Sequence, residues 1–317
     1  MSSLDRLRIN LEELLAKAAQ PTEHDLLVSP LDVIERIFEP RKAGYEFPAF
    51  GKRIAFRPGE LTMWCGMGGS GKSQLVGQVI AWMLAAGERA TIASLEMPME
   101  DTLRRMLTQI YDAPPDWSTA TTWASLMDGR LYLYDQVDRV PADRLLAMVR
   151  VAATELSANH IVIDSLTKCG LPQDGDGYLS KQTDFVDSLQ RTVKHLGVHC
   201  HLVVHLRKGE PGRGGRRGMH DIRGASQISD LADNVLILER NTQRERVLAE
   251  ASVTPESQWS PALVKLHAQC LREPDAVLQV EKQRATGWIG DINLDYHARS
   301  GQFIPQGQMQ AFPYHLQ

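Results

Sequence analysis

The sequence predicts an α/β fold in which helices flank a mostly parallel, twisted sheet. From Gly59 onward, short apolar runs alternate with longer segments of helical periodicity, and a glycine-rich turn joins one of these runs to a helix. This alternation is typical of a mostly parallel sheet whose faces are covered by helices. We expect strands at residues 61–65, 90–95, 131–134, 161–164, 198–204, 235–238 and 276–280.

The helices are expected between these strands. Residues 72–86 place four apolar side chains on one face of a helix, and Gly87 supplies the signal that ends it. Pro141 opens the next long helix, because proline suits the first helical turn. Ser180 is expected to cap a further helix that runs to Leu196, since a serine oxygen can accept a hydrogen bond from a free backbone N–H.

Composition narrows the class of protein. With 43% hydrophobic and 23% charged residues, the 317-residue chain has ordinary globular composition. The net charge of -4 argues against coating nucleic acid through overall positive charge, although local basic patches remain possible. No apolar run approaches the roughly 18 residues of a membrane span, so we expect no membrane partner. The four cysteines lie far apart without a C-x-x-C pair, which indicates a reducing cytoplasm rather than a zinc ribbon or a disulfide framework.

The strongest signal is a phosphate-binding pattern. Residues 66–73 read Gly66-Met67-Gly68-Gly69-Ser70-Gly71-Lys72-Ser73, the complete G-x-x-x-x-G-K-[ST] motif, and Gln74 follows. Its glycines let backbone N–H groups close around phosphates, Lys72 reaches the β and γ phosphates, and the Ser73 hydroxyl holds Mg²⁺. A phosphate then lies at a helix N-terminus. The motif predicts that the chain binds ATP, or another nucleoside triphosphate, together with Mg²⁺.

A dinucleotide-binding turn is the competing interpretation of these glycines. Gly66, Gly68 and Gly71 also satisfy G-x-G-x-x-G. Such a turn has no use for the lysine and hydroxyl of Lys72 and Ser73, and it expects an acid about 20 residues later that contacts the ribose. The phosphate loop is therefore preferred.

Polar residues at the expected strand ends supply candidate catalytic groups, because functional groups collect beyond the carboxyl ends of such sheets. We examine Glu96, Asp164, His205 and Glu239 for this reason, and Lys282 with Arg284. Asp164 ends an apolar run, an arrangement that puts a carboxylate beside the magnesium of a phosphate loop. A simple solvated strand end is the alternative for Asp164.

Two further strand ends are interpreted as parts of the hydrolytic machinery. Glu96 follows the strand after the phosphate-loop helix, where a carboxylate can orient or deprotonate the attacking water. The alternative for Glu96 is a surface glutamate that caps the helix after Pro98. An imidazole at His205 can contact the γ phosphate and report its loss, whereas a purely structural histidine is the alternative.

A glycine-rich basic segment follows His205. Residues 207–223 carry six Arg or Lys against Glu210 and Asp221, a local charge of +4. Without an interleaved aromatic residue, contact with a nucleic-acid backbone fits better than base stacking, and a solvated basic loop is the alternative. The residues assigned to DNA binding are Arg207, Lys208, Arg213, Arg216, Arg217, Arg223 and Gly224.

In combination, these residues resemble the DnaB-like family of hexameric replicative DNA helicases, especially the helicase half of phage primase-helicases and mitochondrial Twinkle. The resemblance runs from about Gly59 to Gln302 and is most specific between Asp221 and Asn241. The stretches that carry it are Gly59-Glu60-Leu61, Ser94-Leu95-Glu96-Met97, Ile163-Asp164-Ser165, Val204-His205-Leu206-Arg207, Asp221-Ile222-Arg223-Gly224-Ala225-Ser226, Leu231-Ala232-Asp233 and Leu238-Glu239-Arg240-Asn241.

The resemblance implies a RecA-like core, hexameric rings, ATP sites between subunits and single-stranded DNA in a central channel. Residues 281–287 look like the last motif of the family. In that motif Arg284 is the finger that reaches the neighbour's site, and Lys282 contacts the same phosphates. By rough alignment, Arg240 and Tyr296 contact the nucleotide base.

The domain division follows from the same comparison. Residues 1–45 form an N-terminal helical arm, in which a leucine-rich helix at 4–18 packs on its own domain or, as the family favours, on a neighbouring subunit. Residues 46–310 form the ATPase domain, interrupted at about 242–274 by an insertion that we expect to be a small helical subdomain, and 311–317 form a tail. The segment before the core is too short for a primase domain, so a primase or polymerase partner is expected to be a separate protein.

The leading hypothesis is an ATP-driven replicative helicase that translocates on single-stranded DNA at the replication fork, in the host cytoplasm if the protein is phage-encoded. The alternatives are a RecA- or RadA-type recombinase, a KaiC-like regulatory ATPase, and a nucleotide-switched loader or regulator of a separate helicase. These alternatives share the core, so the motif alone does not separate them.

Overall fold

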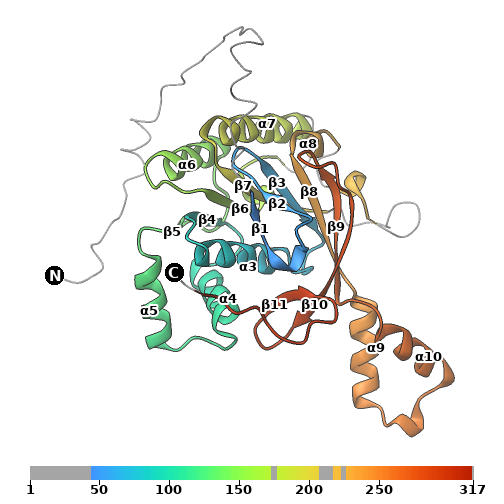
Figure 1. The fold of residues 1–317 in the computed structure, drawn as a ribbon. Coiled ribbons are helices and arrows are strands. Elements are labelled where there is room, and N and C mark those ends of the chain that lie inside the picture. The colour runs from blue at the N-terminus through green and yellow to red at the C-terminus, as the bar shows by residue number, and fades with distance from the viewer. Residues whose placement is uncertain (1–43, 173–176, 207–216, 223–225, 316–317) are drawn as a thin grey trace.

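The computed structural model describes residues 44–172, 177–206, 217–222 and 226–315, and the helix predicted at 4–18 lies outside these ranges. A nine-stranded sheet forms the centre, in the order β11-β10-β9-β8-β3-β7-β6-β4-β5, and helices cover both of its faces (Figure 1). None of the helices in the described ranges combines the length and the apolar character needed to cross a bilayer.

Six neighbouring strands of this sheet are parallel, as predicted. Their bounds agree with the expected strands to within two residues at each end. They are β3 (Leu61–Gly66), β4 (Ala90–Ser94), β5 (Leu131–Leu133), β6 (His160–Asp164), β7 (His199–His205) and β8 (Asn234–Arg240). The α/β class with a mostly parallel sheet is therefore confirmed.

The other side of the sheet is antiparallel. It consists of β9 (Ala276–Gln283), β10 (Gly290–His297) and β11 (Gln302–Pro305), of which only β9 was predicted. Because β9 runs against β8, its carboxyl end lies beside the start of β8, where Gln283 pairs with Asn234. The expectation that Lys282 and Arg284 share an edge with Glu96 and Asp164 is wrong for this reason.

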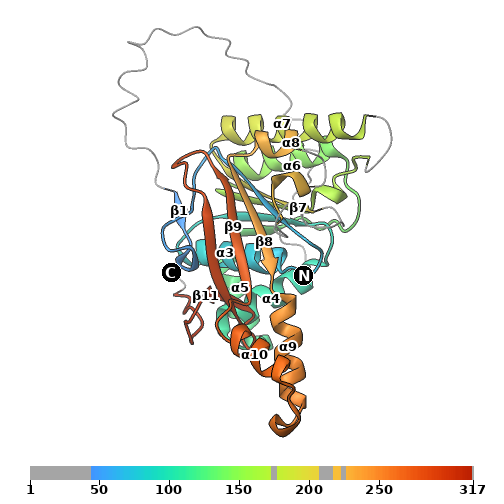
Figure 2. The ribbon, with the colours of Figure 1, turned by 90° about the vertical axis from the view of Figure 1, so that its right-hand side faces the viewer.

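Helices divide between the two faces (Figures 1 and 2). One face carries α3 (Lys72–Ala85), α4 (Met99–Tyr111) and α5 (Trp117–Met127), and the other carries α6 (Ala142–Thr154), α7 (Tyr178–Leu196) and α8 (Ser226–Leu231). Short 3-10 turns lie at Pro48–Phe50, Leu166–Lys168, Met219–Asp221 and Glu256–Gln258.

The predicted start of α7 at Ser180 is wrong. The helix begins at Tyr178, because Gly177 adopts a left-handed conformation (φ 74°) and turns the chain into the helix three residues earlier. Ser180 therefore lies in the first turn. Its hydroxyl is 3.5 Å from the Asp184 carboxylate.

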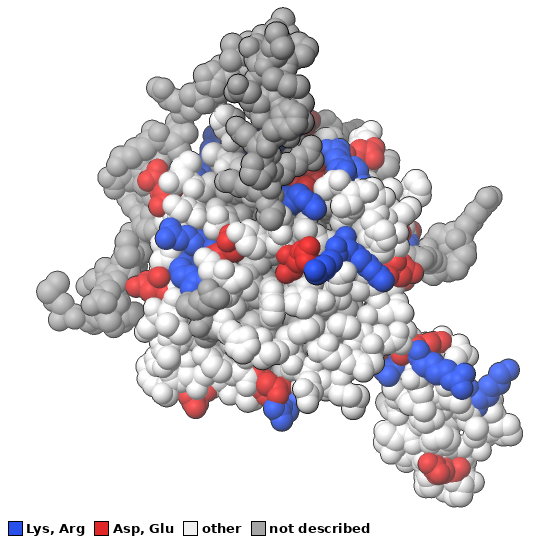
Figure 3. All heavy atoms as spheres, in the orientation of Figure 1, with Lys and Arg blue, Asp and Glu red and all other residues white. Residues whose placement is uncertain are grey.

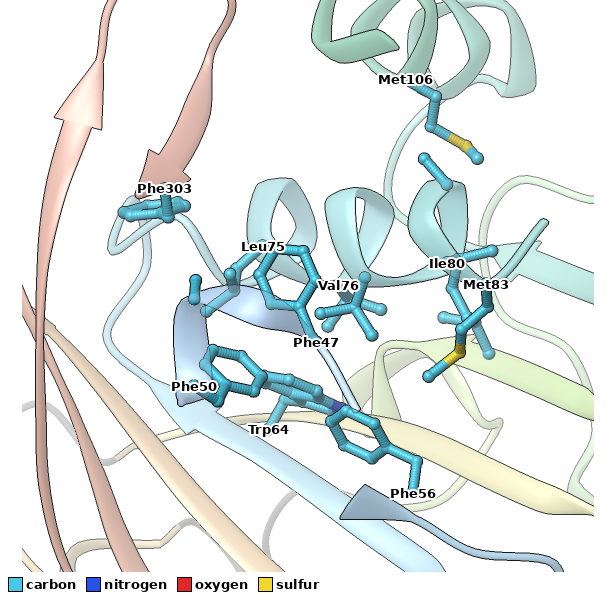
Figure 4. Close-up of a cluster of buried hydrophobic side chains, with 14 of the residues drawn as sticks. Phe47, Phe50, Phe56, Trp64, Leu75, Val76, Ile80, Met83, Met106 and Phe303 are labelled. Carbon is cyan, nitrogen blue, oxygen red and sulfur yellow. The ribbon is translucent and has the colours of Figure 1, made fainter. Parts of the chain in front are cut away.

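Each face of the sheet has its own apolar core. Beneath α3, the rings of Phe47, Phe50, Phe56 and Trp64 pack together (Figure 4), and Phe56 stacks on Trp64 with ring centroids 5.7 Å apart. A two-stranded ribbon, β1 (Tyr45–Glu46) and β2 (Ala55–Phe56), brackets this cluster. In the tail, the ring of Phe312 packs edge-on against Phe47. These contacts hold the phosphate-loop helix firmly against the sheet.

The segment at 242–274 forms a helical hairpin between β8 and β9. It consists of α9 (Thr242–Val253) and α10 (Pro261–Cys270), capped by the side chains of Asn241 and Ser260. The hairpin stands away from the body of the molecule, and both acidic and basic side chains lie on it (Figures 2 and 3). The residues inserted here are therefore helical, as expected from their sequence.

Candidate active site

A cavity of about 920 Å³ opens at the carboxyl edge of the parallel strands. The ends of β3, β4, β7 and β8 bring together residues that are far apart in the sequence. Of the predicted site residues, the cavity is lined by Gly68, Gly69, Ser70, Gly71, Lys72, Ser73, Gln74, Glu96, His205, Arg240 and Tyr296.

The phosphate loop is held in shape by close backbone approach. A Cβ atom on Gly66 would lie 2.6 Å from Ser70 Oγ and 2.7 Å from the Leu238 carbonyl, so only glycine fits. Gly71 has φ 93° and lies against the ring of Phe303. The Lys72 ammonium donates to the carbonyls of Gly66 (3.0 Å) and Met67 (2.8 Å). Burial lowers the pKa of Lys72, while the negative charge of Asp164 opposes that shift.

Asp164 and Ser73 meet at the end of the phosphate loop. Burial raises the pKa of Asp164, and a hydrogen bond with the Ser73 side chain counteracts this effect. Within the described part of the chain, Asp164 Oδ1 and Ser70 Oγ are buried and find no hydrogen-bond partner. Buried polar atoms are normally paired, so these two oxygens fit a bound polar ligand. A hydroxyl beside a carboxylate is also a donor set that suits Mg²⁺, which keeps water and phosphate oxygens as its other ligands.

Glu96 lies across the cavity from the phosphate loop. Its Oε1 accepts hydrogen bonds from the hydroxyls of Ser165 and Thr167 and, at 3.0 Å, from His205 Nε2. The hydrogen bond from His205 is the main cause that lowers the pKa of Glu96 to about 2. Helix α4 begins after Pro98 without a side-chain cap, so Glu96 does not serve as a helix cap. The carboxylate is thus kept ionised and faces the cavity.

The far wall of the cavity comes from the antiparallel strands and the root of the hairpin. The Tyr296 ring, 43% exposed, lies 5.4 Å from the ring of Phe303, measured between centroids. Arg240 pairs with Glu245 of α9, and its Nη1 is 3.4 Å from the Gly69 carbonyl. An aromatic face and a guanidinium plane at the mouth can hold a planar base.

Gln74 lines the cavity, but its side chain is engaged elsewhere. Its amide donates to the Gly301 carbonyl at 2.8 Å, and the Gln109 amide donates to the same carbonyl at 3.0 Å. Gln74 therefore ties the phosphate-loop helix to the turn before β11.

Several known proteins have sequences similar to this chain. Residues 55–211 match the family model described as an AAA domain. The chain is 28% identical over 210 residues to the DNA helicase/primase of Enterobacteria phage T3, covering 61% of this chain and 37% of that protein. It is 24% identical over 265 residues to the chloroplastic/mitochondrial Twinkle homolog protein of Arabidopsis thaliana, covering 78% of this chain and 34% of that protein. The chain is therefore similar in sequence to a phage DNA helicase/primase and to a Twinkle homolog protein.

Solved structures support the same fold. The ATPase domain of G40P superposes with a TM-score of 0.61 at 15% identity, covering 79% of this chain and 86% of that chain. A DnaB-like replicative helicase, in a structure describing its interactions with primase, gives a TM-score of 0.65 at 14% identity, covering 89% of this chain and 68% of that chain. The chain has the RecA-like ATPase fold of these structures, and it spans about a third of the length of the two curated relatives named above.

Five residues that line the cavity were missed by the sequence reasoning. They are Arg105, Glu245, Asp275, Ala276 and Phe303. Asp275 forms an ion pair with Arg244 and accepts a hydrogen bond from the Tyr296 N–H at 2.8 Å, so it orders this wall of the cavity. A signal was available for β10, because Ile292 and Leu294 alternate with polar residues, but nothing local marks Arg105.

Some predicted site residues lie away from this cavity, and others fall outside the residues that the structure describes. Arg284 pairs with Asp233 at 3.2 Å, and the Lys282 ammonium donates to the Ser229 and Asp230 carbonyls, all at the amino edge of the sheet. Arg217 donates its backbone N–H to Glu239 at 3.3 Å. Outside the described residues lie Arg207, Lys208, Arg213, Arg216, Arg223 and Gly224.

Proposed function

We propose that this chain is the motor subunit of an ATP-dependent DNA helicase, which hydrolyses a nucleoside triphosphate with Mg²⁺ and translocates on single-stranded DNA. The observation that carries the proposal is the convergence of Lys72, Ser73 and Glu96 on one cavity, with the buried Asp164 hydrogen-bonded to Ser73 behind it. The kinship with DNA helicases supplies the class of polymer on which the motor acts.

Each group has a chemical role in this proposal. Lys72 would exchange the carbonyls of Gly66 and Met67 for phosphate oxygens, and Ser73 and Asp164 would hold the metal ion. When bound, Mg²⁺ neutralises the charge that develops on the phosphates during transfer. Glu96 orients the attacking water, and His205 holds the Glu96 carboxylate in place. Arg240 and Tyr296 bracket the base at the mouth of the cavity.

The position of Arg284 suggests that several copies of the chain assemble. In one chain this side chain lies at the amino edge, whereas the phosphate loop follows the carboxyl end of β3, so Arg284 is placed to serve a site other than that of its own chain. A ring of copies, hexameric in this proposal, lets it reach the neighbouring nucleotide. A finger supplied in this way is worth roughly 10³ to 10⁵ in rate. The basic segment at 207–223 would contact the DNA backbone, and a primase or polymerase would act as a separate partner.

The test measures ATP hydrolysis by the full chain with and without single-stranded DNA, together with the mass of the assembly in Mg-ATP. We expect strong stimulation by DNA, a species near six times 35.4 kDa, and displacement of a DNA strand from a fork. Arg284→Ala should keep nucleotide binding and lose the DNA-stimulated rate. A monomer whose ATPase rate ignores DNA would refute the motor and favour a nucleotide-switched loader, and wild-type turnover in Arg284→Ala would refute the finger.

A further inference from the structure

The two oxygens of the Glu96 carboxylate have unequal surroundings. Oε1 is contacted by three groups: the Ser165 hydroxyl, the Thr167 hydroxyl at 2.9 Å and His205 Nε2 at 3.0 Å. Oε2 has one longer contact, from the same His205 nitrogen at 3.3 Å. A carboxylate oxygen offers about two lone pairs, so Oε1 is saturated while Oε2 keeps capacity to accept.

One short turn supplies both hydroxyls. Ser165 follows Asp164 at the end of β6, and the 3-10 turn Leu166–Lys168 brings Thr167 back toward it, with the two hydroxyl oxygens 2.5 Å apart. The turn is closed by the Lys168 N–H, which donates to the Ser165 carbonyl at 3.0 Å. Ser165 is fully buried, so its side chain is fixed by its surroundings.

Strand pairing sets the distance between this turn and Glu96. Strands β4 and β6 are parallel neighbours, with Ser94 opposite Asp164. The Leu95 N–H donates to the Asp164 carbonyl at 2.7 Å, which extends the pairing by one residue beyond β4. Glu96 therefore leaves its strand directly beside the turn. Ser165, whose hydroxyl contacts Glu96, is the residue directly after Asp164 in the chain.

We propose that Ser165 and Thr167 are positioning residues for Glu96, which hold its Oε1 so that Oε2 is presented to the attacking water. This inference rests on the proposed nucleotide hydrolysis. Asp164 and the turn that follows it would then do two things. Asp164 would hold the metal ion, and Ser165 with Thr167 would orient Glu96, the proposed base. An ionised carboxylate with one oxygen fixed has lost the rotation that would otherwise turn it away from the water.

The hydroxyl of Thr167 is the one to remove, because Thr167→Val keeps its shape. We expect Thr167→Val to lower kcat by about tenfold, the effect of losing one hydrogen bond to a charged group. KM for ATP should stay within about twofold, since the nucleotide is held by other residues. Thr167→Ser, which restores the hydroxyl, should return kcat to near the wild-type value.

Two controls separate positioning from a structural role. Thr183→Val removes a hydroxyl that donates only to a backbone carbonyl in α7, at 2.8 Å, and should leave kcat unchanged. In the Glu96→Gln background, Thr167→Val should change the residual turnover by less than about twofold, because Thr167 acts only through the Glu96 carboxylate and that carboxylate is already gone. A structural defect would lower turnover equally in both backgrounds.

The outcomes are distinct. A fall in kcat that Thr167→Ser rescues and Glu96→Gln masks supports the inference. An active wild-type protein whose Thr167→Val variant keeps its kcat, or gains DNA-independent turnover, overturns the inference and leaves the proposed function standing. A wild-type protein that hydrolyses no nucleotide under any condition overturns both.

Discussion

The two ends of the parallel strands contain buried polar groups of different kinds. At the carboxyl edge, Asp164 Oδ1 and Ser70 Oγ have no hydrogen-bond partner among the described residues. Toward the amino edge, Thr62 Oγ1 and His199 Nε2 lie 2.9 Å apart, and the Trp64 indole donates to His201 Nδ1 at 3.2 Å. Unpaired buried groups destabilise a fold, whereas networks of paired groups specify it.

The amino edge also has buried atoms without a partner among the described residues, such as His160 Nε2 and Asn234 Oδ1, but these side chains belong to the hydrogen-bonded network around Thr62 and His201. The unpaired oxygens of the carboxyl edge lie beside the phosphate loop instead, where a ligand would meet them.

This difference has a consequence for charge. At the carboxyl edge the site keeps Glu96 ionised through hydrogen bonds from His205, Ser165 and Thr167. Toward the amino edge, burial lowers the pKa of the imidazoles of His160, His199 and His201, and these side chains are neutral at pH 7. Substitutions at the first edge should change activity more than stability, and those at the second should do the reverse.

The largest expected effect is on activity at the carboxyl edge. Lys72→Ala removes the ammonium that we propose binds the phosphates, and we expect ATP turnover to fall by about 100- to 1,000-fold or more. Lys181→Ala, on an exposed position of α7, is the matched control and should keep wild-type turnover. Steady-state phosphate release measures both. Residual turnover above a tenth of wild type would contradict the role given to Lys72.

The next effect is a loss of stability in acid, caused by the three imidazoles. Because their folded pKa values lie below the ordinary 6.5, to about 4 for His199, the unfolded chain takes up protons that the folded chain does not. Stability is fully present above pH 6.5 and should be lost as pH falls from there toward 4. Each imidazole contributes up to about 1.4 kcal/mol per pH unit.

Urea unfolding at pH 7.5, 6.5 and 5.5 measures this slope. His201→Gln should flatten it, while His195→Gln, at an exposed position of α7, should leave it unchanged. A free energy of unfolding that stays constant across this range would show that the imidazoles are not held neutral.

A smaller effect on stability is expected within the phosphate loop. Gly66→Ala forces a Cβ atom against Ser70 Oγ and the Leu238 carbonyl, and we expect a loss of about 1–3 kcal/mol. Gly68→Ala is the matched control, since no described atom lies within 4 Å of its added Cβ. Thermal unfolding without nucleotide compares the two variants. Equal melting temperatures would mean that the loop is looser than its packing indicates.

The smallest effect is expected for the ion pair at the amino edge. The Arg284 side chain is 48% exposed, so Arg284→Ala should lower the free energy of unfolding by less than about 1 kcal/mol. Asp233→Ala should cost more, because Asp233 also accepts the Leu61 N–H at 2.9 Å. Urea unfolding of both variants tests the ranking. A larger loss for Arg284→Ala would give that residue a structural task instead of a task in a neighbouring site.

The features predicted correctly are those that a short stretch of sequence determines. Six parallel strands and the loop at 66–73 carry periodicity or a fixed spacing, and the structure confirms their places. The local sequence does not show whether β9 runs parallel or antiparallel to β8, because this depends on how the connecting chain brings the two strands together. The sequence reasoning therefore misplaced Lys282 and Arg284 relative to the pocket.

The contacts around Glu96 also lay beyond sequence reasoning. Ser165 and Thr167 are about 70 positions away in the chain, and only the parallel pairing of β4 with β6 brings them to the carboxylate. The network of His160, His199 and His201 was missed because lone histidines at strand starts carry no motif. Arg105 projects from α4 without any pattern to mark it.

The helical hairpin α9–α10 leaves the sheet and returns to it at one point. The Asn241 N–H donates to the Asp275 carbonyl at 2.8 Å, and Arg240 is paired directly with Ala276. Strands β8 and β9 are thus already closed as an antiparallel pair beneath the hairpin. The part of the hairpin beyond its first turn can therefore change in length without disturbing this strand pairing, whereas Arg244 and Glu245 in the first turn of α9 belong to the wall of the cavity.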